Sequence, residues 1–431
     1  MPSEPSNDLF TSLFVPDSVR EAVSGRAWLQ AMLDTERAYA AAAARAGVIP
    51  ADTAERIAAA CDADGFDVAQ IAVEGRRVAN PAEPLVRALR KTVGGEDAQY
   101  VHYGAASQDV VDTAAMLVAR RSLDLILGDL DAVAAACARL ADAHRATIIP
   151  ARTLLQQAVP TTFGLKAASW LVGVVEARQR LEAVRRERLA VQLGGAGGTL
   201  AALGTRGAEV MRLLAEELGL AEPTIPWHAL RGRIAELGAA LDLAAAACAK
   251  IARDVTLLAQ TEVGEASTGD DGRSSTMPHK RNPASALLAL ACAHHAHAQA
   301  GILTASVVQE HERGAGAWQA EWEALSGALA FAGGAAAGSR AMLEGLRVDE
   351  ERMRRNLVEP ALAERAAFLL AERLGLPGAQ EAVSSGGSIR DVLAQHLSPA
   401  EVESALDPAG YLGSADVFVD RALRLYRTEL G

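Results

Sequence analysis

The chain has 431 residues, of which 50% are hydrophobic and 4% aromatic, and its formal net charge is −12. This length is enough for a large core. The apolar residues are mainly Ala and Leu, which favour close-packed helices over sheets rich in aromatic and β-branched residues. The negative charge, without a stripe of Lys and Arg, argues against a nucleic-acid-binding surface. A local basic cluster can still bind a small anionic substrate.

The cysteines are scattered, with no spacing typical of a metal site or of a disulfide framework, which fits a reduced compartment. Residues 1–14 lack the basic segment and apolar core of a signal peptide. No uncharged apolar run approaches the length of a membrane span. We therefore predict a cytoplasmic protein that contacts neither nucleic acid nor a membrane.

Residues 1–109 are predicted to form an N-terminal helical domain. An amphipathic run over 28–46 ends at Gly47 and Pro50, two residues that commonly terminate helices. Asn80-Pro81 is a second break in the pattern. Between and after these breaks we expect further helices, at about 51–61, in a segment ending near 77, and at 85–92.

A polar segment over 100–113, Y-V-H-Y-G-A-A-S-Q-D-V-V-D-T, precedes a long predicted helix. It contains His102, Ser107, Gln108 and Asp109, which are candidates for binding or catalysis. Two structural interpretations stay open. Ser107 or Asp109 could accept a backbone N–H as a helix cap, and His102 could be a buried histidine with a satisfied hydrogen bond.

Two heptad seams follow, in which apolar residues alternate at spacings of three and four. This spacing is typical of helices packed nearly parallel in a bundle. Pro150 is expected to end the first of these helices. The seams lie within residues 110–347, which we predict to be a central long-helix domain, and they comprise Leu123, Ile126, Leu130, Val133, Cys137 and Leu140, then Ile234, Leu237, Leu241, Ala244, Cys248, Ile251, Val255 and Leu258.

A second polar segment over 151–164 reads A-R-T-L-L-Q-Q-A-V-P-T-T-F-G. Its polar side chains precede Pro160, and another long helix is expected to run to about residue 193. A polar corner of a helix bundle is the structural alternative. The glycine-rich stretch 194–198 lacks the Gly-Lys-Ser/Thr ending of a phosphate loop, so we interpret it as a bend between helices.

A third polar segment, G-R-S-S-T-M-P-H-K-R-N-P over 272–283, follows the second seam. The preceding residues 264–272 have almost no apolar side chain and suit a mobile surface loop. A helix is expected to leave Pro283 and to run to about residue 310. Its histidines at 294, 295 and 297 lack the spacing of four that helical metal pairs need, which argues against a metal site.

After about residue 347 the pattern changes to shorter helices. The breaks between them are expected at Gly375, Pro377, Gly386 and Gly387. We predict a small C-terminal helical domain over 348–431.

The run S-S-T-M-P-H-K-R-N-P resembles the signature of the fumarase/aspartase superfamily, in the form found in its adenylosuccinate lyase and 3-carboxy-cis,cis-muconate cycloisomerase branches. The segments 100–113 and 151–164 are similar to the first and second active-site regions of that superfamily. The resemblance covers nearly the whole chain and weakens beyond about residue 350. It implies an all-α, three-domain fold with a central bundle of long helices.

The resemblance also implies a chemistry in which a base removes a proton beside a carboxylate and a group on the neighbouring carbon leaves. Ser274 would be the base in its alkoxide form, which needs nearby N–H groups and cations. Lys280 and Asn282 would stabilise the charge that develops on the carboxylate. His102 would be a candidate acid. The other residues expected to bind the small di- or tricarboxylate substrate are Ser107, Gln108, Arg152, Thr153, Gln156 and Arg231.

No metal or organic cofactor is implied by the resemblance. It does imply a homotetramer, because the superfamily builds each active site from regions of three different chains. The chain departs from the superfamily pattern at Leu154, where His is usual, and at Ala106, where Thr or Ser is usual.

Leu154 bears on the leaving group. An amine or hydroxide leaving group needs a proton from a positioned acid, whereas a carboxylate, whose conjugate acid has a pKa of about 4, does not. An apolar residue is therefore compatible with opening and closing a lactone. Our first hypothesis is a 3-carboxy-cis,cis-muconate cycloisomerase. The second is a lyase of the same fold that releases nitrite or an amine from a succinate-like substrate. The third is a non-catalytic helical scaffold.

Overall fold

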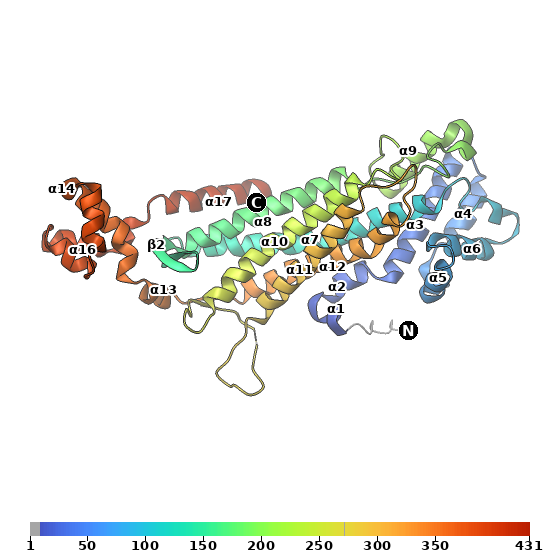
Figure 1. Ribbon diagram of the computed structural model, residues 1–431. Coiled ribbons are helices and arrows are strands. Elements are labelled where there is room, and N and C mark those ends of the chain that lie inside the picture. Colours follow the sequence, from blue (N-terminus) through green and yellow to red (C-terminus); the bar gives the residue numbers. More distant parts are fainter. Residues whose placement is uncertain (1–8, 271) are drawn as a thin grey trace. The chain divides into compact units, whose positions relative to one another are not determined.

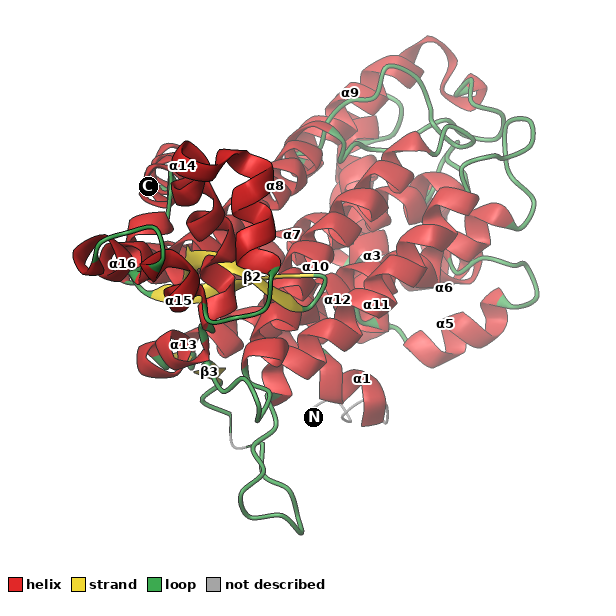
Figure 2. Ribbon diagram, turned by 60° about the vertical axis from the view of Figure 1, so that its left-hand side comes forward, coloured by secondary structure: helices red, strands yellow, loops and turns green. Residues whose placement is uncertain are grey.

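The computed structural model describes residues 9–270 and 272–431. It is predominantly helical, with short strands, so the predicted all-α fold class is confirmed (Figures 1 and 2). The backbone forms two compact units, each built from several stretches of the chain. The first comprises Met1–Asp129, Ala177–Cys248 and Leu288–Ala337, and the second comprises Leu130–Glu176, Ala249–Leu287 and Gly338–Gly431. The three-domain division stays a prediction.

Long helices contribute residues to both units and carry the predicted seams. All eight positions of the second seam, from Ile234 to Leu258, are buried in α10. In α7, Leu123, Ile126 and Leu130 are fully buried, but the helix ends at Ala143. Pro150 therefore does not end it, contrary to the prediction. The long helices are α7 Ser107–Ala143, α8 Phe163–Glu187, α10 Gly232–Leu258, α11 Ala284–Ala305 and α12 Ala317–Glu344.

The first unit adds shorter helices, of which α3 shows why they form. The Ser24 side chain accepts a hydrogen bond from the Ala27 N–H at the start of α3, and Gly47, with φ of 71°, follows its end. The remaining elements are α1 Leu9–Phe14, α2 Asp17–Ala22, α3 Gly25–Arg45, α4 Ala51–Ala59, α5 Val68–Gly75, α6 Ala82–Val93 and α9 Gly207–Leu218, with 3₁₀ turns η1 Ala63–Gly65, η2 Gly95–Tyr100 and η3 Ala201–Arg206.

The second unit contains the described strands and the C-terminal helices. The short helices pack on a core of their own that includes Leu370, Leu393 and Val402, and Gly375, with φ of 70°, kinks α14. The elements are β1 Ile148–Thr153, β2 Gln156–Thr162, β3 Ala266–Ser267, β4 Arg347–Val348, α13 Glu350–Asn356, α14 Ala363–Ser384, α15 Ile389–Ala394, α16 Pro399–Leu406 and α17 Ala415–Leu430, with 3₁₀ turns η4 Glu359–Leu362 and η5 Pro408–Tyr411.

A β-hairpin occupies the second polar segment, where only helices and a corner were expected. Strands β1 and β2 pair antiparallel, with Thr153 opposite Gln156. The two residues between them, Leu154 and Leu155, have φ of 50° and 66°, the backbone of a type I′ turn. The prediction missed this hairpin because type I′ turns usually carry Asn-Gly rather than leucines.

All four cysteines are buried thiols. None of the helices in the described part of the chain is long and apolar enough to cross a bilayer.

Candidate active site

The signature loop, residues 272–283, lies between α10 and α11, and its two ends are held together at a neck. Arg273 and Arg281 form an antiparallel bridge, and the Asn282 N–H donates to the Gly272 carbonyl over 2.8 Å. The two ends of the loop approach so closely that a Cβ on Gly272 would lie 1.9 Å from the Asn282 carbonyl oxygen. Glycine is therefore required at this position. The neck presents the segment from Ser274 to Lys280 as one protruding turn.

Within this turn, two backbone N–H groups donate to the predicted base. The Ser274 Oγ accepts hydrogen bonds from the N–H groups of Thr276, at 3.4 Å, and of Met277, at 3.2 Å. Donors in this position stabilise negative charge on an oxygen, as a serine alkoxide requires. Lys280 is exposed and Asn282 is half-buried in the same loop. The structure thus brings Ser274, Lys280 and Asn282 onto one loop.

The first residues of the segment 264–272, which was expected to be a mobile surface loop, are anchored, while residue 271 lies outside the described part of the chain. Ala266 and Ser267 pair with β4, and Ala266 is buried. Glu265 is fully buried. Arg152 from the hairpin donates to both oxygens of Glu265, at 2.8 and 2.6 Å, and Asn356 donates to one of them at 2.8 Å. A bidentate pair with a buried carboxylate fixes this end of the loop.

The same contact occupies the guanidinium of Arg152, a predicted substrate-binding residue. Thr153 and Gln156 are exposed at the end of the hairpin, on either side of the turn. Leu154 and Leu155 at that turn are 96% and 74% exposed. Substrate binding by Arg152, Thr153 and Gln156 stays a prediction.

In the first unit, His102 is held by a buried carboxylate. Its Nδ1 lies 2.6 Å from the Oε1 of Glu36, which is 1% exposed. Burial lowers the pKa of His102, but attraction and hydrogen bonding to the Glu36 carboxylate outweigh it and leave the pKa raised. Glu36 was not among the predicted site residues.

At the start of α7, the helix-cap interpretation is confirmed for Asp109. One of its oxygens accepts from the Ala106 N–H at 2.8 Å, and its carboxylate also accepts from the N–H groups of Gly194 and Gly195. Its other contact is with the ring of His228 at 2.7 Å. The glycine-rich bend is therefore tied to the start of α7 by a carboxylate.

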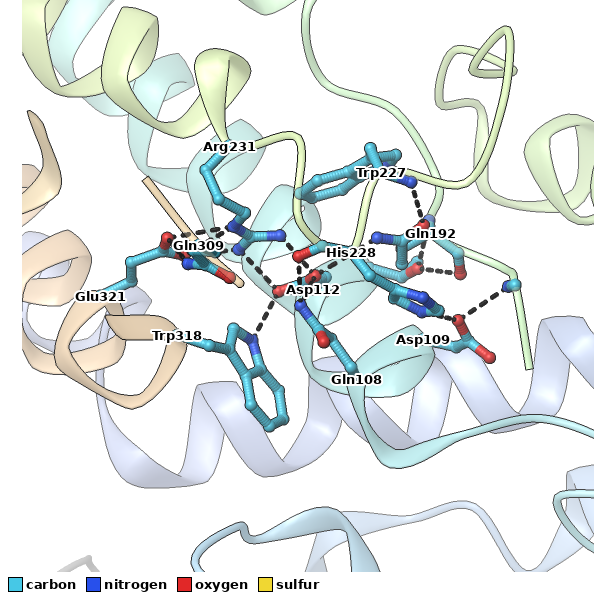
Figure 3. Close-up of polar contacts among 12 residues, drawn as sticks. Gln108, Asp109, Asp112, Gln192, Trp227, His228, Arg231, Gln309, Trp318 and Glu321 are labelled. Atoms are coloured by element: carbon cyan, nitrogen blue, oxygen red, sulfur yellow. Dashed lines mark hydrogen bonds and ion pairs between the residues drawn. The ribbon is translucent and has the colours of Figure 1, made fainter. Parts of the chain in front are cut away.

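Gln108 and Arg231 lie in a buried polar cluster beside this cap (Figure 3). The Gln108 amide donates to Asp112 at 3.1 Å and to the His228 carbonyl at 2.9 Å. Arg231, 1% exposed, lies between the carboxylates of Asp112 and Glu321 and donates to both oxygens of each.

The contacts of Arg231 affect the pKa of one of its carboxylate partners. Burial raises the pKa of Glu321, partly offset by Arg231. The Arg231 guanidinium is occupied by its two carboxylate partners, whereas the Gln108 amide oxygen is buried without a hydrogen bond among the described residues. Ser107, the first residue of α7, is half-buried. Substrate binding by these three residues stays a prediction.

The predicted residues thus form separate groups. His102, Ser107, Gln108 and Arg231 belong to the first unit, whereas Arg152, Thr153, Gln156, Ser274, Lys280 and Asn282 belong to the second. Two of the three histidines whose spacing argued against a metal site have local contacts: His295 stacks on Phe331, and His297 lies 3.0 Å from Asp242.

Comparison with known proteins places the chain in a family. The family model described as a lyase matches residues 15–296. A 3-carboxy-cis,cis-muconate cycloisomerase from Bradyrhizobium diazoefficiens is 45% identical, over 94% of this chain and 95% of its own length. A nitrosuccinate lyase from Streptomyces davaonensis is also 45% identical, over 94% of this chain and 92% of its own length.

A solved structure agrees with these relatives. The crystal structure of 3-carboxy-cis,cis-muconate lactonizing enzyme from Pseudomonas putida superposes with a TM-score of 0.92 at 40% identity, covering 99% of this chain and 100% of that one. The signature loop, the helical fold and these full-length matches agree, and the chain belongs to the lyase family of the fumarase/aspartase superfamily.

Proposed function

We propose that the protein is a cycloisomerase that interconverts 3-carboxy-cis,cis-muconate and a carboxymuconolactone without a cofactor. In lactone opening, the Ser274 alkoxide removes a proton from the carbon beside a carboxylate. The ring C–O bond then breaks and the lactone oxygen leaves as a carboxylate. Opening thus releases one proton, which Ser274 passes to solvent, and closure is the reverse, with one proton taken up by the same carbon.

The observation that carries the proposal is the environment of Ser274 in the signature loop. Its Oγ accepts hydrogen bonds from two backbone N–H groups, and these bonds favour the charged form of the base. Lys280 and Asn282, on the same loop, bind the carboxylate that gains charge in the transition state. The cycloisomerase relatives, which match over nearly the whole chain, support this substrate.

The apolar hairpin turn supports the same reaction. A carboxylate leaving group needs no proton donor, and Leu154 cannot supply one.

We propose in addition a cytoplasmic homotetramer with shared active sites, in which the exposed Leu154 and Leu155 contact a neighbouring copy.

The test is a spectrophotometric assay with 3-carboxy-cis,cis-muconate, following loss of the conjugated diene absorbance. We expect lactone formation by the purified protein, and a fall of about 1,000-fold or more in kcat for Ser274→Ala, as for loss of an essential proton-transfer group. Ser275→Ala, which changes the neighbouring hydroxyl in the same loop, is the matched control and is expected to keep most of the activity. A fully active Ser274→Ala enzyme would remove the assignment of the base.

A second candidate is elimination of nitrite from nitrosuccinate to give fumarate. It is favoured by the nitrosuccinate lyase relative, which is as similar as the cycloisomerase from Bradyrhizobium diazoefficiens. Nitrite is also a weakly basic leaving group, so Leu154 is compatible with it. Fumarate absorbance from nitrosuccinate, with no reaction of the muconate, would select this function over the first.

A further inference from the structure

The buried carboxylate of Glu36 is the feature of the first unit that the proposed mechanism does not use. It lies in α3, is 1% exposed, and approaches His102 Nδ1 at 2.6 Å. Its second oxygen, Oε2, is buried without a hydrogen bond among the described residues. A carboxylate withdrawn from water in this way needs a cation next to it.

The backbone around His102 is fixed in an unusual conformation. His102 has φ of 59°, in the left-handed region that non-glycine residues rarely adopt. The carbonyls on either side are both bound: Arg90 donates to Val101 O, at 3.1 and 3.4 Å, and the Tyr39 hydroxyl donates to Tyr103 O. Strained residues held from several sides are concentrated at functional sites.

We propose that Glu36 is a positioning residue that holds His102 as an imidazolium, so that its Nε2–H can bind a carboxylate of the substrate. Nδ1 is occupied by Glu36, and Nε2 has no hydrogen-bond partner in the described part of the chain. A ring whose Nδ1–H is bound by a carboxylate is fixed in orientation, and its other nitrogen is the one available to a ligand. The inference rests on the proposed function, because it names a contact of that substrate.

The charges that face His102 favour this state. Glu36 from α3 and Asp109 from α7 attract the cation, while Arg90 from α6 opposes it. Burial acts against the cation as well, but the net effect is a raised pKa of His102. Because the folded pKa is raised, the stability contributed by the pair is full below the ordinary pKa of histidine. It is lost as the pH rises through the folded pKa.

The decisive experiment is an NMR titration of the substrate-free enzyme with labelled histidine, with His102 assigned from a His102→Asn sample. We expect His102 in the unmodified enzyme to titrate above the ordinary value, and its neutral form to carry the proton on Nδ1. Glu36→Gln, which removes the charge at equal size, is expected to lower this pKa. It is also expected to raise KM about tenfold, the loss of one charge-assisted hydrogen bond, and to move the alkaline limb of kcat/KM to lower pH.

Asp34→Asn is the matched control. Asp34 is another buried carboxylate on α3, and it pairs with Arg121 at 2.6 Å rather than with His102. It is expected to leave the His102 titration and the pH profile unchanged. An ordinary or lowered pKa of His102 in the unmodified enzyme would overturn the proposal even if Glu36→Gln fails to fold. Because the titration needs no substrate, it is independent of which substrate the enzyme uses.

Discussion

At the scale of single residues, burial separates charges that hold the fold from charges that are open to a ligand. Arg231 resembles a substrate-binding residue by its place in the sequence, yet it is 1% exposed and lies between two carboxylates. Lys280, in contrast, is exposed on the signature loop. Both residues are cations that the resemblance assigns to substrate binding or to charge stabilisation, and only the structure distinguishes their surroundings.

Arg231→Met should therefore destabilise the protein strongly. Removing the guanidinium leaves Asp112 and Glu321 buried together without a cation, which costs about 3–5 kcal/mol. Chemical denaturation monitored by circular dichroism measures the change in the free energy of unfolding. Arg186→Met is the matched control, because the ion pair of Arg186 with Glu187 is exposed and its loss should change the free energy of unfolding little. Equal losses in the two variants would contradict the structural role of Arg231.

Glu36 shows a residue that sequence reasoning could have found. The buried positions Leu29, Met32, Leu33, Glu36 and Tyr39 follow the three-and-four spacing of one helix face. An acidic residue on such a face is rarely left without a partner. The sequence could thus have indicated that Glu36 has a special role, although not that His102 is its partner, because the two are far apart along the chain.

At the scale of elements, apolar periodicity predicted the long helices α7 and α10 well and the β-hairpin not at all. The seam of α10 is buried at every predicted position because heptad spacing has a direct geometric meaning. The hairpin has a polar, exposed end and a Leu-Leu turn, so neither alternation nor turn residues marked it. Similarly, the buried Glu265 accepts hydrogen bonds from Arg152 and Asn356, contacts that local composition cannot reveal.

The neck of the signature loop gives a prediction at this scale. Gly272→Ala puts a methyl group 1.9 Å from the Asn282 carbonyl oxygen, so the two ends of the loop must separate and Ser274 must move. We expect kcat/KM to fall about 100-fold, the cost of misplacing a catalytic group by about 1 Å. The free energy of unfolding should change by less than about 1 kcal/mol, because the loop is exposed.

Gly65→Ala is the control, since a Cβ there meets no atom within 4 Å and the residue lies in a distant part of the sequence. Both variants are compared by steady-state kinetics and by denaturation. An unchanged rate for Gly272→Ala would show that the close approach at the neck does not position the base.

At the scale of the whole molecule, the signature carried most of the functional information. It indicated the superfamily, and the full-length relatives confirm that membership. The substrate is less determined by the sequence, because a cycloisomerase and a nitrosuccinate lyase are equally similar to the chain. Removal of a proton beside a carboxylate is common to both reactions, whereas only a few side chains determine which leaving group the site accepts.

The proposed tetramer with shared sites leads to the last prediction, which concerns mixtures of two variants that each lack one of the proposed site residues. His102 belongs to the first unit and Ser274 to the second. If each active site takes these residues from different chains, then tetramers assembled from His102→Asn and Ser274→Ala chains contain some sites in which both residues are intact. Random assembly makes that fraction about one quarter, because each of the two positions is intact with a chance of one half.

The variants are unfolded together, refolded and assayed, and each variant refolded alone is the control. Recovery of about a quarter of the unmodified activity is the expected result for shared sites in a closed, symmetric assembly. If both residues came from the same chain, every site would lack one of them, whatever the mixture. Activity no higher than that of the separate variants, in a mixture that has refolded to the same size, would therefore place each active site within a single chain.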